Sequence, residues 1–469
     1  MPLGLYISVP FCRSKCSYCN FASDVFSSSI FQRYIDRVCA DIFRSAEISE
    51  EMGGVSDRAI DSVYLGGGTP TVLDIAELQR LFVTISQNFD VQPGSEITVE
   101  CAPGTLTPAL LDLVPRCGVN RVSLGAQSFI DQESRSVGRL HTRTTVIDDI
   151  ARLRGAGIEN INIDLIAGLP HQNLESWNLS LSHVIDSGVP HVSVYMLEID
   201  EDSRLGRELI AGGTRYHAHF VPDEDLIAHL YEIACERLDN AGVRQYEISN
   251  FARKGHESRH NLKYWTRQPY LGFGVDAHSM LQAKAGMKAE NQEGRRALTG
   301  CEQTSVHGID CEQMPVPSMA ETGASSLVPP SPFPLSFREG FSPRGICFSD
   351  FPCGPLEAVR FATPDSLDKF LAGARPQRTP VSPANSLEES FFLGLRLNRG
   401  VDLSRQAASF GDEVLRAFSP AIAECMEQNL LERDDERIRL TSRGRLLSNE
   451  VFARFLRHDG QEISLTTQT

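Results

Sequence analysis

The chain has 469 residues, of which 41% are hydrophobic and 23% charged, a composition ordinary for a globular protein of two or three domains. Its formal net charge of −16 argues against nucleic-acid binding, because phosphate recognition needs a surplus of Lys and Arg on one face. No segment approaches the about 18 apolar residues of a membrane span and no signal peptide opens the chain, so we expect a cytoplasmic protein without a transmembrane segment.

Short apolar runs alternate with longer helical patterns from Leu5 to about Leu197. Their nearly continuous Val, Ile and Leu content is typical of strands buried on both faces of a parallel sheet. The runs are Tyr6–Val9, Ser62–Leu65, Glu96–Glu100, Arg121–Leu124, Ile161–Ile166 and His191–Met196. We therefore predict an α/β fold, an incomplete (β/α)6 barrel, with functional side chains just after each strand.

Helical patterns separate these runs, and glycines mark where three of the helices should end. The patterns are Ile75–Asn88, Pro108–Cys117, Thr144–Ala156 and Leu174–Ser187. Gly118, Gly157 and Gly188 follow the last three, in the position of left-handed caps.

The rest of the chain divides into an extension, an insertion and a tail. Helix Asp223–Ala241, run Val243–Ile248 and the polar stretch Ser249–Trp265 complete a first domain over residues 1–283. Residues 284–356 are rich in Pro, Ser and Gly without periodicity, and we predict a disordered insertion. Residues 357–469 predict a small C-terminal α+β domain, helix–helix–strand–helix, shaped like a winged helix.

Three cysteines, Cys12, Cys16 and Cys19, follow the first run at spacings of four and three residues. Thiolates at this density suit zinc or an iron–sulfur cluster. A structural zinc site needs a fourth ligand, and no Cys or His follows for many residues, whereas three ligands on a four-iron cluster leave one iron open for a substrate. The alternative is an incidental group of buried thiols.

The other nine cysteines show no such spacing. With no secretory signal, twelve cysteines predict a reducing compartment in which thiols serve metals or cores. We interpret one set as packing residues: Cys39, Cys101, Cys117, Cys235 and Cys425. Cys301, Cys311, Cys347 and Cys353 lie in the insertion and suggest a second metal site, but their spacing matches no ligand pattern.

Polar and glycine residues follow several runs. Gly66-Gly67-Gly68-Thr69-Pro70 allows close approach of backbone to a ligand, or forms only a tight strand–helix turn. Carboxylates accept hydrogen bonds from hydroxyl or ammonium groups, and a guanidinium pairs with a carboxylate. Four such polar residues are Glu100, Gln127, Arg139 and Asp164. Singly, each of them could cap a helix. Together at one edge of the sheet they indicate a ligand pocket.

With these motifs the chain resembles the radical S-adenosylmethionine (SAM) superfamily and, within it, the oxygen-independent coproporphyrinogen III oxidase family. Adding Arg259-His260-Asn261-Leu262-Lys263-Tyr264-Trp265 makes it similar to the HemW-type haem-chaperone branch. The resemblance implies that Cys12, Cys16 and Cys19 hold a [4Fe–4S] cluster whose open iron chelates SAM. It also implies a set of SAM contacts: Tyr6, Tyr18, Gly67, Gly68, Thr69, Glu100, Gln127, Arg139 and Asp164.

Two features separate the branches. True oxidases of this family carry a fourth cysteine where Phe21 stands here and have a long N-terminal arm, so we expect no porphyrinogen decarboxylation. The second feature is the motif Arg259–Trp265. It contains a histidine, whose imidazole is a common haem ligand, and aromatic rings that can stack on a porphyrin. The haem candidates are His260, Asn261, Tyr264 and Trp265, with His256 as an alternative ligand. Alternatively, this motif is a loop whose polar residues tie the backbone and whose aromatics fill a core.

The resemblance thus implies a haem chaperone that holds haem, a [4Fe–4S] cluster and SAM, forms a cluster-linked homodimer, and passes haem to acceptor proteins. The electron donor is not identified by any motif. The rival hypotheses are coproporphyrinogen III oxidation and the modification of RNA or a small molecule, of which the acidic composition disfavours RNA.

Overall fold

This computed structural model describes residues 1–201, 203–287 and 357–456. The predicted insertion lies outside the described residues from residue 288 onward, and so do its four cysteines.

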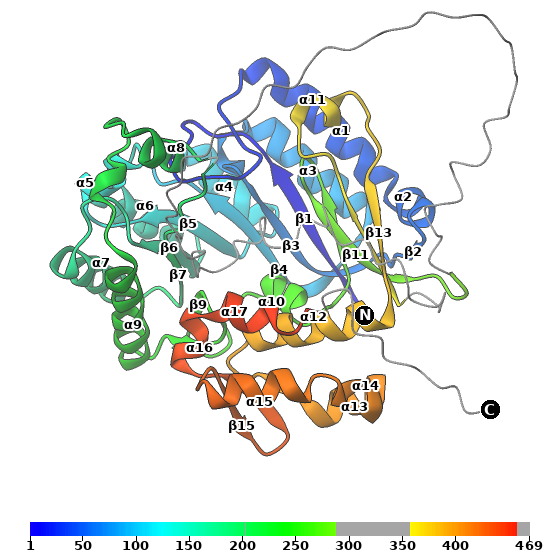
Figure 1. The fold of residues 1–469 in the computed structure, drawn as a ribbon. Helices are drawn as coiled ribbons and strands as arrows, with labels where there is room; N and C mark the ends of the chain where they lie inside the picture. The colour runs from blue at the N-terminus through cyan, green and yellow to red at the C-terminus, as the bar shows by residue number, and fades with distance from the viewer. Residues whose placement is uncertain (202, 288–356, 457–469) are drawn as a thin grey trace, which may run out of the picture.

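A curved sheet forms the centre of the molecule (Figure 1). Six strands run parallel in the order of the chain and confirm the six predicted runs: β1 (Leu3–Val9), β3 (Ala59–Gly67), β4 (Asp90–Cys101), β5 (Arg121–Gln127), β6 (Asn160–Ala167) and β7 (His191–Met196). Strands at the two edges were not predicted as part of this sheet: β2 (Gly54–Val55), β8 (Arg244–Gln245), β9 (Asn250–Ala252), β10 (Tyr270–Phe273), β11 (His278–Ala283), β12 (Ala358–Ala362) and β13 (Gln377–Val381). Within the described residues the strand order is an open path with two ends, as expected for an incomplete barrel.

Most helices of the first 240 residues lie along the outer side of this sheet (Figure 1). The helices of this part and three single 3-10 turns are α1 (Phe31–Phe43), α2 (Ser45–Glu51), α3 (Ile75–Asn88), α4 (Pro108–Arg116), α5 (Asp131–Ser136), α6 (Arg143–Gly155), α7 (Leu174–Ser187), α8 (Arg204–Ala211), α9 (Glu224–Asn240), and η1 (Ser28–Ile30), η2 (Pro70–Val72) and η3 (Ala218–Phe220). The predicted caps are present, because Gly118, Gly157 and Gly188 all have positive φ, of 82°, 84° and 66°. α1 and α2 had no counterpart in the prediction.

The two faces of the central strands differ in chemistry. On β3, Val63 and Leu65 belong to the apolar core shared with the outer helices, whereas the alternate residues Ser62 and Tyr64 face the inner side. The same alternation on β5 places Ser123 inside, where its hydroxyl donates to Asp164 on β6. Both faces are mostly buried, as predicted, but the inner face is polar.

The C-terminal residues build a second core around α12 (Pro383–Arg396). Its elements are β14 (Val401–Asp402), α13 (Leu403–Phe410), α14 (Asp412–Arg416), α15 (Ser419–Glu427), β15 (Leu431–Asp434), β16 (Arg437–Leu440), α16 (Ser442–Leu446) and α17 (Ser448–Ala453). Gly411, which has φ 92°, separates α13 from α14. Asp435 turns the β15–β16 hairpin, the place of the predicted wing.

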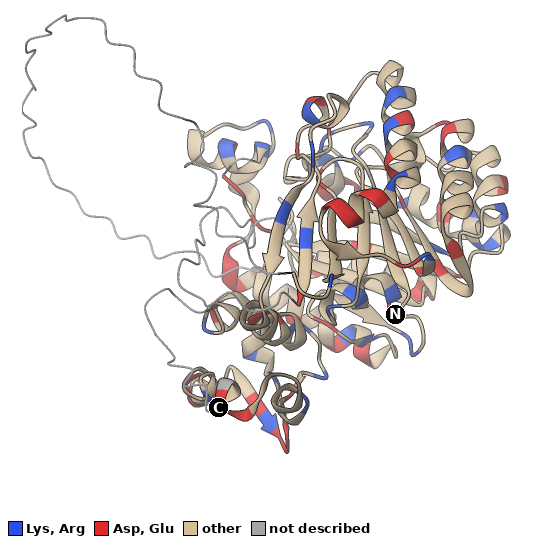
Figure 2. Cartoon of the chain, turned by 90° about the vertical axis from the view of Figure 1, so that its right-hand side faces the viewer, with Lys and Arg blue, Asp and Glu red and all other residues tan. Residues whose placement is uncertain are grey.

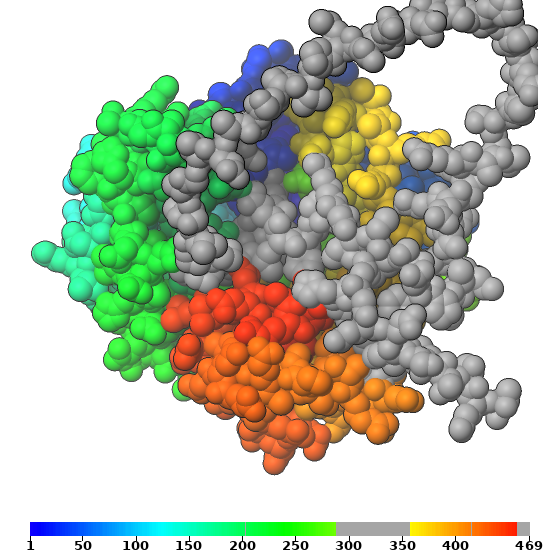
Figure 3. Space-filling view, in the orientation of Figure 1, coloured from blue at the N-terminus to red at the C-terminus, as the bar shows by residue number. Residues whose placement is uncertain are grey.

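This second core packs directly on the main sheet domain. In the space-filling view its orange-to-red residues lie against the green segment that contains α9 (Figure 3). Ile248 joins the C-terminal core, and Arg396 pairs with the buried Glu247 at 3.3 Å. Residues 358–381, which we had placed in the third domain, instead add β12, α11 (Leu367–Leu371) and β13 to the first unit. These contacts between the two cores lie at the end of α12.

The polar stretch Ser249–Trp265 is not a plain loop, because it contains β9 and the helix α10 (Arg259–Trp265). No helix among the described residues has the length and apolar composition needed to cross a membrane. On the side shown in Figure 2, Lys and Arg alternate with Asp and Glu and form no continuous basic stripe.

Candidate functional site

The cysteine loop begins where β1 ends and is fixed by backbone hydrogen bonds. Asp24 donates to Pro10 O at 3.0 Å, and Cys12 donates to Asp24 O at 3.0 Å, so the loop closes on its own base. The Lys15 ammonium donates to two carbonyls inside the loop, Phe21 O at 2.7 Å and Ser23 O at 2.6 Å. The loop conformation is thus established by the protein itself.

The thiols of this loop are enclosed and surrounded by donors. Burial raises the pKa of Cys12 and of Cys19, and Cys16 is 8% exposed. Arg139 Nη1 donates to Cys16 Sγ at 3.5 Å, and Thr69 Oγ1 donates to Cys12 Sγ at 3.8 Å. Donors of this kind stabilise thiolates, so the sulfur set fits a [4Fe–4S] cluster held at three corners.

The other described cysteines show no site. All eight cysteines in the described ranges are free thiols. Among the residues the structure describes, no three His, Cys, Asp or Glu are arranged to hold a single metal ion.

The glycine turn after β3 fastens the cysteine loop to the sheet. Gly68 N donates to Val9 O and Thr69 N to Phe11 O, both at 2.8 Å. A Cβ on Gly68 would lie 2.7 Å from Val9 O and 2.8 Å from Phe11 O, so no larger residue fits. Gly67 has φ 99° and donates to Glu100 Oε2 at 3.2 Å. The turn therefore has a structural role whether or not it also contacts a ligand.

Two carboxyl groups stand at the strand ends on the inner face. Burial raises the pKa of Glu100 to about 7, although Tyr64 donates to Oε1 at 2.8 Å. Burial also raises the pKa of Asp164, whose oxygens accept from Asn162 Nδ2 at 2.7 Å and Ser123 Oγ at 3.2 Å. A ligand that brings hydroxyl or ammonium donors would favour the ionised form of these acids.

The remaining residues predicted to contact SAM also lie near this edge. Gln127 ends β5 with φ 67°, and Arg139 donates to Gly125 O as well as to Cys16 Sγ. Tyr18 packs in a small apolar cluster with Val137, Leu169 and Leu205. Tyr6 lies on the inner face, 6.2 Å between ring centroids from Tyr64. The residues predicted to contact SAM thus come from five strands, β1 and β3–β6, and from the loops that follow β1, β3 and α5.

His260 lies deep in the fold and its imidazole is fully engaged. It is 1% exposed, with Nδ1 3.0 Å from Ser62 Oγ and Nε2 2.8 Å from Tyr264 Oη. Its ring stacks on Tyr64 at 5.3 Å, beneath the inner face of the sheet. Burial, with Lys263 and Arg121 nearby, lowers the pKa of His260 to about 3. In this conformation neither ring nitrogen is available to haem iron.

The other motif residues also make structural contacts. Lys263, 2% exposed, pairs with Asp61 at 2.7 Å, and the Arg396 guanidinium lies 4.3 Å from the Trp265 ring. Asn261 N donates to Ser258 Oγ, which caps α10. His256 is half-buried and its backbone N–H donates to Arg253 O. The motif thus forms a helix, not the loop that was the alternative expectation.

Sequence reasoning missed Glu96 and Arg121, which lie on the inner face at 5% and 2% exposure. Glu96 accepts hydrogen bonds from the backbone N–H groups of Arg259 and His260, so its carboxylate stabilises the start of α10. Alternation of polar and apolar residues at 96–99 and 121–124 was the available signal.

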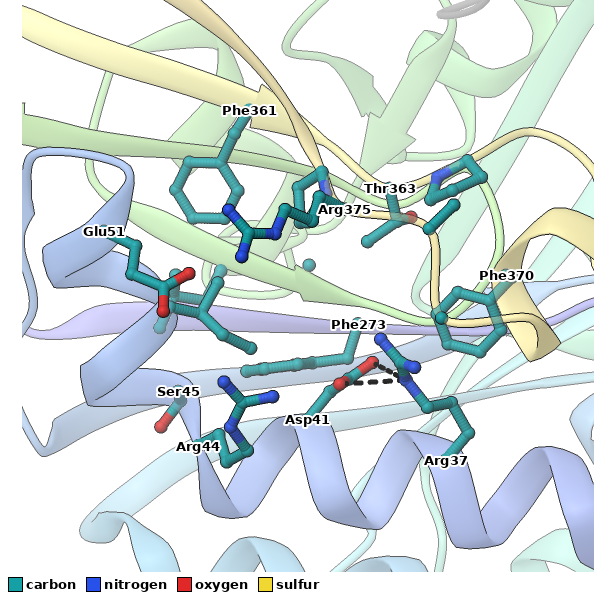
Figure 4. Close-up of a pocket in the computed structure, with 17 residues that line it drawn as sticks. Arg37, Asp41, Arg44, Ser45, Glu51, Phe273, Phe361, Thr363, Phe370 and Arg375 are labelled. Atoms are coloured by element: carbon teal, nitrogen blue, oxygen red, sulfur yellow. Dashed lines mark hydrogen bonds and ion pairs between the residues drawn. The ribbon is translucent and has the colours of Figure 1, made fainter.

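Two cavities lie in the described part of the molecule, one beside the cysteine loop and one at the β10–β12 edge of the sheet. One, of about 200 Å³, opens beside the cysteine loop and includes Thr69 and Arg139 in its wall. The other, of about 190 Å³, lies between α1–α2 and the β10–β12 edge, where Arg44 and Arg375 point inward and Arg37 pairs with Asp41 (Figure 4). None of the predicted cluster, SAM or haem residues lines this second cavity.

Comparison with known proteins agrees with this arrangement. The Radical SAM superfamily profile matches residues 6–183 and the HemN C-terminal domain profile matches residues 381–447. The chain is 30% identical over 454 residues to the "Heme chaperone HemW" of Bacillus subtilis (strain 168), covering 96% of this chain and 98% of that protein. The chain belongs to the HemW family of radical SAM proteins.

Two further similarities support the family and the fold. The "Heme chaperone HemW" of Lactococcus lactis is 29% identical over 458 residues, covering 98% of both chains. The solved structure of Escherichia coli coproporphyrinogen III oxidase (HemN) superposes with a TM-score of 0.70 at 20% identity, covering 97% of this chain and 90% of that one. That likeness concerns the fold alone.

Proposed function

We propose that this protein is a haem chaperone that binds haem, a [4Fe–4S] cluster and SAM and delivers haem to acceptor proteins. The observation that carries the proposal is near full-length similarity to proteins named as haem chaperones, covering 98% of each of two of them. The cysteine loop on this sheet adds independent chemical support, because two of its three thiols accept hydrogen bonds from neighbouring donors.

In this proposal Cys12, Cys16 and Cys19 hold the cluster, which supplies low-potential electron chemistry and a coordination position for SAM. The residues at the strand ends bind and orient SAM. Glu100 and Asp164 accept hydrogen bonds, Arg139 keeps the thiolate edge positive, and Gly67 and Gly68 allow close backbone approach. Tyr6, Tyr18, Thr69 and Gln127 complete the contacts.

The remaining parts of the proposal concern location and partners. A cytoplasmic location is supported by the free thiols of the described residues. A homodimer and an electron donor belong to the proposal without further support from the structure. Nucleic acid is not an expected partner, given the net charge of −16.

A haemin titration of the anaerobically reconstituted protein tests haem binding. We expect a shifted Soret band that saturates near one haem per chain, and faster haem transfer to an apo-haemoprotein than from haem-loaded serum albumin. Absence of any Soret change would contradict the proposal. Coproporphyrinogen III oxidation is the alternative, favoured only by the HemN-like fold, and vinyl products after anaerobic incubation with SAM and a reductant would support it.

Glu100→Gln should separate SAM binding from stability. The raised pKa of Glu100, about 7, means that the folded state holds a proton that the unfolded state releases above about pH 4.5. Stability from this group therefore falls as pH rises from 4.5 to 7, by about 3 kcal/mol. We expect the apo variant to be more stable than wild type at pH 8 but equal at pH 4.5 in urea unfolding, and its SAM Kd to rise about 10- to 100-fold. Equal SAM affinity in the two proteins would remove Glu100 from the SAM contacts.

A further inference from the structure

Arg121 is a buried cation on the inner face of the sheet. It begins β5, is 2% exposed, and alternates with Val122, which belongs to the apolar core on the outer side. Its position along the sheet is next to Thr98 of β4 and one inner row below Glu100. The charge of Arg121 acts on groups of the same face, since it contributes to the lowered pKa of His260.

The guanidinium of Arg121 makes no hydrogen bond or ion pair with the described residues, and its Nε lacks any hydrogen-bond partner. Thr98 Oγ1, on the neighbouring strand in the same row, is also buried without a partner. Adjacent buried donors of this kind are rare, because a polar group taken from water without a replacement hydrogen bond is costly.

The carboxylates near Arg121 are engaged by other donors. Glu100 accepts from Tyr64 Oη and Gly67 N, and Asp164 accepts from Asn162 and Ser123. Glu96 accepts from the N-terminal backbone of α10. These acids balance the charge of Arg121 at a distance but do not occupy its donors.

The inner face is reachable from the edge that carries the cysteine loop. Tyr195, at the end of β7 on the same face, is 42% exposed, and Glu100 and Asp164 are half-buried. Tyr6, Tyr64, Thr98 and Arg121 are register partners on adjacent strands and lie in one inner row, so a ligand bound by the two donors lies beside two aromatic rings. An anionic group carried by an apolar ligand matches this arrangement.

We propose that Arg121, with Thr98, binds a carboxylate of the ligand held on the inner face, and that this carboxylate is a haem propionate. The second clause rests on the proposed function. The planar guanidinium of Arg121 and the hydroxyl of Thr98 can donate together to one carboxylate. Hydrogen bonds between a guanidinium and a carboxylate are charge-assisted and therefore strong. The SAM carboxylate is the other source of the same chemistry.

The experiment combines a substitution of Arg121 with esterification of the haem propionates. Haemin and haem dimethyl ester, whose propionates carry no charge, are titrated into wild type, Arg121→Met and the control Arg116→Met, whose arginine is exposed at the end of α4. For haemin we expect Kd to rise about 10- to 100-fold in Arg121→Met and to stay unchanged in the control. We expect wild type to bind the ester as weakly as Arg121→Met binds haemin. For Arg121→Met, we expect similar Kd values for haemin and the ester.

Four binding outcomes would overturn the inference. Equal binding of haemin and its ester by wild type would do so, even if the variant failed to fold. A folded Arg121→Met that binds haemin normally would do so as well, while leaving haem binding itself intact. If Arg121→Met and Arg121→Lys discriminate less between SAM and decarboxylated SAM than wild type does, with haemin affinity unchanged, the carboxylate belongs to SAM. Failure of wild type to bind haemin counts against the proposed function and with it the propionate assignment.

Stability separates ligand binding from a structural role. A buried arginine without a direct partner contributes little to folding, so we expect Arg121→Met to melt within a few degrees of wild type in the absence of haem. A large drop in melting temperature for both Arg121→Met and Arg121→Lys would identify Arg121 as a structural residue and contradict the proposal.

Discussion

Serine at Cys12, Cys16 and Cys19 together should abolish the cluster and leave the fold intact. The proposed cluster would bring about four irons and four sulfides per chain, all held by these three thiolates. Serine hydroxyls do not ionise at neutral pH and are poor ligands for iron–sulfur clusters. We expect iron and sulfide to fall to background, the broad visible absorption to vanish, and SAM binding to weaken by at least about 10-fold.

The folded structure predicts that this variant remains stable. Contacts to the thiols are weak and long, 3.5 Å from Arg139 to Cys16 and 3.8 Å from Thr69 to Cys12. The loop is fixed instead by backbone bonds and Lys15, which the variant keeps. The matched control replaces three cysteines outside the loop by serine, and it should retain iron and sulfide: Cys39, Cys117 and Cys235. Cluster retained in the first variant would contradict the assignment of the cysteine loop.

His260→Ala should be the most destabilising single substitution in the motif. It removes an imidazole that is 1% exposed, and Ser62 and Tyr264 each lose the hydrogen bond that they share with it. A cavity and two weakened polar groups together cost about 3 kcal/mol. Urea unfolding of the apo protein measures this loss. His229→Ala, at an exposed position of α9, is the control and should change stability by less than about 0.5 kcal/mol.

The same histidine predicts sensitivity to acid. Its pKa is lowered from 6.5 to about 3 by burial and by the neighbouring cations Lys263 and Arg121, so the unfolded chain binds a proton that the folded protein excludes. Stability from this group is therefore lost as pH falls below 6.5, by about 2 kcal/mol at pH 5. Comparing wild type with His260→Gln at pH 7 and pH 5 isolates this contribution. Parallel pH dependence in the two proteins would contradict the burial of His260.

The burial of His260 also affects how a haem-binding experiment on a His260 variant is interpreted. A loss of Soret change in His260→Ala could follow from disruption of the inner face instead of loss of an iron ligand. His260→Gln preserves size and hydrogen bonding, so retained haem binding in that variant would indicate a structural role. His256, half-buried outside α10, provides the independent comparison.

Much of the barrel was predictable because its signals are local. Apolar runs, helical periods and the caps at Gly118, Gly157 and Gly188 depend on residues close in sequence. The edge strands β10–β13 were missed because they are short, and because β11 pairs with β12 across the long insertion, as Met280 with Arg360 does. The haem motif was not recognised as a helix because seven residues give too few periods to detect.

The sequence by itself determined the parallel α/β order, the cysteine loop and the residues that end each strand, because parallel strands bring their carboxyl ends to one edge. Only the tertiary structure decided what those residues do to one another. The burial of His260, the sharing of Glu96 with α10 and the isolation of Arg121 all arise between segments over 20 residues apart. Hydrogen-bond partners and desolvation are properties of the packed face, which no local pattern encodes.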